Sequence, residues 1–75
     1  MAVMWEVRAA EGRLEELLAF VDQHADPLAQ VYRGEDPEVR VVVIDPTDRG
    51  IVDVPAELVA RDPHVWHFAP VSRAH

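Results

Sequence analysis

The sequence predicts a small α+β domain, a two-layer sandwich in which helices cover an antiparallel sheet. Three observations predict it. Residues 2–9 alternate apolar and polar side chains, which is typical of a strand with one buried face. Residues 14–25 carry leucine, valine and alanine at helical spacing, which is typical of a helix that packs on such a face. Residues 41–44 are four consecutive β-branched aliphatic residues, which predict a strand covered on both faces.

The first predicted strand runs from Ala2 to Ala9. Its odd-numbered side chains, beginning with Val3, are apolar, whereas Glu6 and Arg8 lie among the even-numbered ones. Because successive side chains of a strand point to opposite faces, we expect the odd-numbered face to pack against helices.

A helix is predicted from Glu11 to Ala25, and Asp26-Pro27 should end it, because the residue before a proline disfavours helical backbone. The apolar stripe of this helix recurs with a period of about 3.6 residues and consists of Leu14, Leu17, Leu18, Val21 and Ala25.

A hairpin is predicted next. Its first strand is Leu28–Arg33, its turn is Gly34–Pro37, and its second strand is Val39–Asp45. Helices in a chain of 75 residues can cover only one face of Val41–Ile44. The other face therefore needs a different cover, and a second copy of the chain is the simplest one.

The last third of the chain begins with a turn-rich segment, residues 46–50. Ile51–Val54 is then either a short strand or an irregular connection. Pro55–Arg61 is predicted to be a short second helix, with Pro55 near its first position. His64–Val71 should be the last strand, and Ser72–His75 a frayed tail.

The element order is therefore β-α-β-β-α-β. Right-handed crossovers favour the split βαβ, or ferredoxin-like, arrangement, with the first and third strands in the centre and the second and fourth at the edges. The alternative is a meander in which residues 41–45 pair with residues 51–54.

Composition limits the function classes. The chain is one domain, residues 1–75, without cysteine, so disulfides and thiolate metal sites are excluded. Its net charge of −7 argues against binding to nucleic acid or to an anionic membrane. No apolar run reaches the length of a membrane span and no secretory signal is visible, so we expect a cytoplasmic protein.

The pattern also resembles a known superfamily. The segments that carry the likeness are Trp5-Glu6-Val7-Arg8, Glu11-Gly12-Arg13 ahead of Leu14, Leu17 and Leu18, the paired strands to Ile44, and Val65-Trp66-His67-Phe68. With these the chain resembles the dimeric α/β-barrel proteins, which include the antibiotic biosynthesis monooxygenase-like superfamily. The resemblance implies a dimer formed through the open faces of two sheets. The chain departs from that pattern in its short length and its reduced second helix. Related cofactor-free monooxygenases use Asn, Trp or His near the substrate, and this chain has no Asn.

A ligand pocket is the most specific site hypothesis. The candidate ligand-binding residues are the aromatic and basic side chains expected near the sheet: Trp5, Arg8, Tyr32, Trp66 and His67. Such a pocket between sheet and helices would suit a small aromatic molecule. The competing interpretation, and the more frequent one, is that these aromatic residues form core.

Metal and nucleophile chemistry find little support. His64 and His67 should point to opposite faces of a strand. Asp45–Gly50 superficially resembles a calcium loop but lacks its acidic spacing and closing Glu, so a turn is favoured. We therefore expect no metal and no cofactor, and the sequence identifies no catalytic residue.

The function predicted first is a homodimeric binding module for a small molecule or a partner protein, more consistent with a non-enzyme than with an enzyme. One alternative is a cofactor-independent monooxygenase or isomerase that acts on an aromatic substrate. Another is an interaction module that uses an exposed sheet edge.

Overall fold

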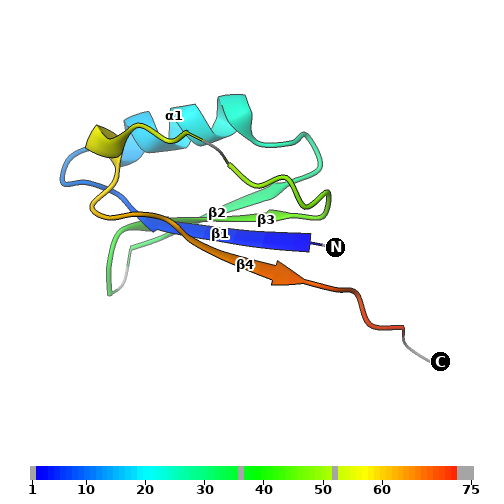
Figure 1. The fold of residues 1–75 in the computed structure, drawn as a ribbon. Helices are drawn as coiled ribbons and strands as arrows, with labels where there is room; N and C mark the ends of the chain where they lie inside the picture. The colour runs from blue at the N-terminus through cyan, green and yellow to red at the C-terminus, as the bar shows by residue number, and fades with distance from the viewer. Residues whose placement is uncertain (1, 36, 52, 73–75) are drawn as a thin grey trace.

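The computed structural model describes residues 2–35, 37–51 and 53–72. It is an α+β structure in which one helix packs on a four-stranded antiparallel sheet (Figure 1). The strands are β1 (Ala2–Arg8), β2 (Gln30–Gly34), β3 (Arg40–Asp45) and β4 (His64–Phe68). The helix is α1 (Leu14–His24), and a 3₁₀ turn, η1 (Ala56–Leu58), precedes β4.

The strand order in the sheet is β2-β3-β1-β4, and all neighbours are antiparallel. The two central strands are β1 and β3, and the two edges are β2 and β4, as the sequence predicted. This arrangement is compatible with a small ferredoxin-like fold. The meander is not formed, because β3 pairs with β1 and β2.

One face of the sheet carries the core. The odd-numbered residues of β1 and β3 point toward α1 and are buried, with Val41 and Val43 fully enclosed. Figure 1 shows α1 and the segment that contains η1 on the same side of the sheet. The core cluster consists of Trp5, Val7, Leu17, Val21, Val41, Val43, Ile51 and Leu58.

The helix is shorter at its start than predicted. It begins at Leu14 rather than Glu11 because Gly12 has a φ of +74°, a left-handed conformation that cannot continue a helix. Its end agrees with the prediction: α1 stops at His24, directly before Ala25 and the Asp26-Pro27 pair.

The strand boundaries also shift. β2 begins at Gln30 and not at Leu28, since the Leu28 N–H donates to the Asp26 carboxylate (2.9 Å) in a turn. β4 ends at Phe68 instead of Val71, shortly before Pro70, which has no N–H to donate. Pairing with β1 likewise covers only residues 64–68.

The predicted second helix, Pro55–Arg61, is wrong: only the 3₁₀ turn η1 forms there. The backbone of residues 58–60 instead hydrogen-bonds the end of β1 and the residues after it. Ala10 N–H donates to Leu58 O, and Ala60 N–H donates to Arg8 O, both at 2.9 Å. These bonds hold Val59 in an extended conformation opposite Ala9, which is incompatible with a helix.

The described part of Ile51–Val54 is an irregular connection and not a strand. Asp53 has a φ of +57°, which no strand accommodates. Val52 lies outside the described residues, as do residues 73–75 of the predicted tail and Asp36 of the predicted turn.

Candidate functional site

The five predicted ligand-binding residues lie on two faces of the sheet. Strand register pairs Met4 with Trp66 and Trp5 with Val65, so Trp5 and Trp66 point in opposite directions. Trp5 faces α1 and is only 1% exposed, which makes it part of the core. His67 also lies on the helix side, since it pairs with Val3.

The other three predicted residues, Arg8, Tyr32 and Trp66, share the face without a helix. They do not converge there, because Tyr32 belongs to edge strand β2 and Trp66 to the opposite edge strand β4. The Tyr32 hydroxyl donates to Gln30 Oε1 (2.9 Å). The rings of Trp66 and His64 meet edge-on, with 5.5 Å between their centroids. The structure therefore does not assemble one pocket from the five predicted residues.

The histidines behave as the spacing predicted. His64 pairs with Glu6 on the open face and His67 with Val3 on the helix side, so they lie on opposite faces. His67 Nδ1 lies 3.0 Å from Asp48 Oδ1. In the described ranges no group of three or more His, Cys, Asp or Glu side chains is arranged to hold a metal ion.

The open face has an apolar half. Its side chains come from all four strands, and four of them are between 39% and 51% exposed. We call this set the apolar patch: Met4, Tyr32, Val42, Ile44, Trp66 and Phe68.

The other half of the open face is charged. Arg40 Nη1 lies 2.8 Å from Glu6 Oε2, and Arg40 Nη2 lies 3.8 Å from Glu38 Oε2. Glu38 also pairs with Arg8. Strand pairing brings these groups together, because Arg8 and Arg40 are directly opposite each other on β1 and β3.

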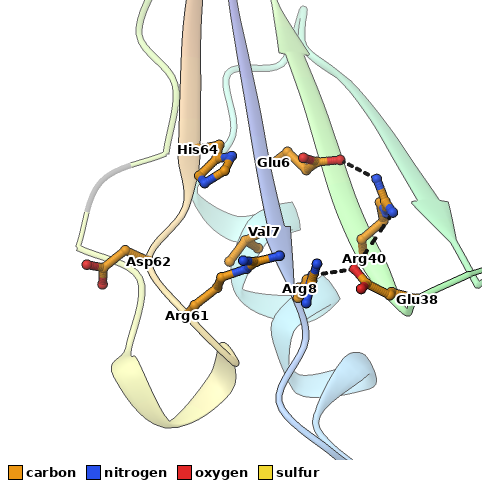
Figure 2. A pocket seen from close by; sticks show the side chains of 8 residues that line it. All are labelled: Glu6, Val7, Arg8, Glu38, Arg40, Arg61, Asp62 and His64. Carbon is orange, nitrogen blue, oxygen red and sulfur yellow. Dashed lines mark hydrogen bonds and ion pairs between the residues drawn. The ribbon is translucent and has the colours of Figure 1, made fainter.

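A small pocket of about 60 Å³ lies at this charged end (Figure 2). Besides the ion-paired groups it is lined by Val7, Arg61, Asp62 and His64. We call it the charged pocket. Sequence reasoning missed Arg61 and Glu38, since both lie outside any periodic pattern and only the fold brings them to the end of β1.

A larger groove continues from the same end of the sheet. Its volume is about 570 Å³, and Arg8 and Glu38 line both it and the charged pocket. The apolar part of its lining comes from the end of β1, the start of α1 and the residues that flank β3 and η1: Ala9, Ala10, Leu14, Val39 and Ala60. We call it the terminal groove. Of the five predicted ligand-binding residues it includes Arg8 alone, because the sequence-based hypothesis placed the pocket around Trp5.

The Asp45 side chain organises the turn after β3. It is 1% exposed, and its carboxylate accepts hydrogen bonds from the Thr47 N–H (2.7 Å) and the Gly50 N–H (3.1 Å). Burial raises the pKa of the Asp45 carboxyl, but the hydrogen bonds from Thr47, Gly50 and Arg49 outweigh it and hold that pKa below its usual value. The residues from Asp45 to Gly50 therefore form a turn stabilised by an ionised carboxylate, as the turn interpretation predicted.

Comparison of the chain with protein-family models, with curated proteins and with solved structures found no match. The resemblance to the dimeric α/β-barrel proteins therefore stays a prediction. Within the part of the chain that the structure describes, no helix has both the length and the apolar character to cross a bilayer.

Proposed function

We propose that this chain is a binding module for a small, largely apolar molecule, which it holds in the terminal groove. The observation that carries the proposal is the size and lining of this groove. Sites for small molecules commonly measure about 300–1,000 Å³ and combine apolar walls with a few polar groups. The terminal groove, at about 570 Å³, is lined by five apolar residues, by the Arg8–Glu38 ion pair and by Gly12 and the carboxylates Glu11 and Glu15.

Filling the groove tests this proposal. Ala60 is exposed and lines the groove, and its backbone N–H bonds to Arg8 O regardless of its side chain. We expect Ala60→Trp to weaken binding of the neutral, apolar dye Nile red at least tenfold, measured by fluorescence titration.

The matched control is Ala19→Trp, at an exposed position of α1 that does not line the groove. This variant should bind the dye as the wild type does. If wild-type protein does not bind the dye, or if Ala60→Trp binds it as well as the wild type, the groove is not the binding site.

We also propose that the module is a homodimer formed through the apolar patch. The chain exposes 5343 Å², whereas a monomer of 8.5 kDa is expected to expose about 4,650 Å². The excess of about 700 Å² is close to the roughly 800 Å² that each partner contributes to a standard interface. Part of it belongs to the extended end beyond β4, where Val71 is 81% exposed.

The position of the apolar patch supports a second copy as its cover. Val42 and Ile44 belong to central strand β3, and Ile44 is 39% exposed while Val41 and Val43 on the other face are fully buried. An uncovered apolar patch on a sheet is buried when an identical patch packs against it, because an isologous contact matches apolar area with apolar area.

A further inference from the structure

The charged pocket combines three arginines with three carboxylates, those of Glu6, Glu38 and Asp62. Three of the seven arginines, Arg8, Arg40 and Arg61, line it, although the net charge of the chain is −7. The acidic residues of the pocket form ion pairs with two of these three arginines. Glu6 pairs with Arg40, and Glu38 is shared between Arg40 and Arg8.

Arg61 is left over. Among the residues that the structure describes it has no ion pair and no side-chain hydrogen bond, whereas Arg13, Arg33 and Arg49 each pair with a carboxylate elsewhere in the molecule. Figure 2 shows its guanidinium directed toward Val7 and Arg8, while the carboxylate of the neighbouring Asp62 points to the other side. The pocket is thus lined by three guanidinium groups. Those of Arg8 and Arg40 have acidic partners, and that of Arg61 has none among the described residues.

Two guanidinium groups that face one small space repel each other unless an anion lies between them. A guanidinium offers several N–H donors in a planar fork that matches the oxygens of an oxyanion. His64 lines the same pocket and offers a ring N–H. A volume of about 60 Å³ admits a head group of a few atoms but not a larger molecule.

From this arrangement we infer that the charged pocket binds the carboxylate of a monocarboxylic acid whose apolar body lies in the terminal groove. The two spaces are adjacent, since Arg8 and Glu38 line both. A carboxylate is favoured over a phosphate because a protein of charge −7 repels a singly charged ligand less. The inference rests on the proposed function of the groove and adds the chemical class of its ligand.

The test compares two probes of almost equal shape, 2-naphthoate and its neutral amide 2-naphthamide, by isothermal titration calorimetry. A charge-assisted hydrogen bond adds about tenfold or more to an affinity, so wild-type protein should bind naphthoate at least tenfold more tightly than the amide. Arg61→Gln should abolish this preference and leave amide binding unchanged. Arg49→Gln makes the same change in net charge at a residue that lines neither space and pairs with Asp26, and it should keep the preference.

The outcomes separate the two proposals. Equal binding of both probes to the wild type, or an equal effect of Arg49→Gln and Arg61→Gln, overturns the carboxylate site but leaves the groove intact. Failure of both probes to bind overturns the groove as well. Tighter binding of 2-naphthyl phosphate than of naphthoate would assign the pocket to phosphate esters and overturn the carboxylate assignment.

Discussion

At the scale of single residues, Asp45 illustrates how this small chain stabilises a charge inside its structure. The carboxylate is buried, and within the described ranges no basic side chain pairs with it. Backbone N–H groups of the turn and the Thr47 hydroxyl satisfy it instead. The residue therefore connects the end of a central strand to the geometry of the following loop.

This arrangement predicts a dependence of stability on pH. The pKa of Asp45 is lowered in the folded state from its ordinary value of 3.8, which the unfolded chain keeps. The stabilisation is therefore complete above about pH 4 and is lost as the pH falls through the folded-state pKa. Asp45→Asn should lower the free energy of unfolding at pH 7 by about 1–3 kcal/mol and make it less dependent on pH below 4.

Urea titrations at pH 7 and between pH 2 and pH 5 check this prediction. Asp22→Asn is the matched control, because Asp22 is an exposed residue of α1. The same loss of stability in both variants would show that the hydrogen bonds of Asp45 contribute nothing specific.

At the scale of elements, the packing of α1 on the sheet supplies most of the core. Leu17 and Val21 are fully buried on the helix face that meets β1 and β3. Because no second helix forms in the described segment 53–61, part of the sheet on the same side stays exposed. Val65 of β4 is 50% exposed there, although its partner Trp5 is enclosed.

Truncation of a core residue on α1 should therefore be severe. Leu17→Ala should lower the free energy of unfolding by about 2–5 kcal/mol, because it removes buried methyl groups and leaves a cavity. Leu28→Ala makes the same chemical change at a position that is 69% exposed and should change stability by less than about 0.5 kcal/mol. Similar midpoints for the two variants in urea denaturation would contradict this assignment of the core.

At the scale of the whole molecule, the two halves of the open face have different expected roles. The apolar patch lies toward the start of β1 and the charged pocket toward its end, so a second copy can cover the first without filling the second. The sheet would then unite a self-association surface and a ligand head-group site.

The solution mass tests the dimer. Light scattering at micromolar concentration should give about twice 8.5 kDa for the wild type. Ile44→Glu places a charge within the apolar patch and should give the monomer mass. Leu28→Glu, at an exposed aliphatic residue outside the patch, should remain dimeric. A monomeric wild-type protein would rule the dimer out at that concentration.

The sequence by itself determined the local structure. The alternation in residues 2–9, the leucine stripe of α1, its end before Asp26-Pro27 and the β-branched run at Val41–Ile44 each depend on neighbours along the chain. For that reason the type and order of four strands and the first helix were predictable. The central positions of β1 and β3 followed from the handedness of the connections.

Only the tertiary structure decided register and long-range partners. Register placed Trp5 in the core and Trp66 on the open face, and so separated two residues that the sequence predicts in one pocket. Hydrogen bonds between residues 58–60 and the end of β1 replaced a predicted helix by a 3₁₀ turn. These bonds form because pairing between distant segments outweighs the weak helical preference of a short one. They also place Arg61 in the lining of the charged pocket together with Arg8.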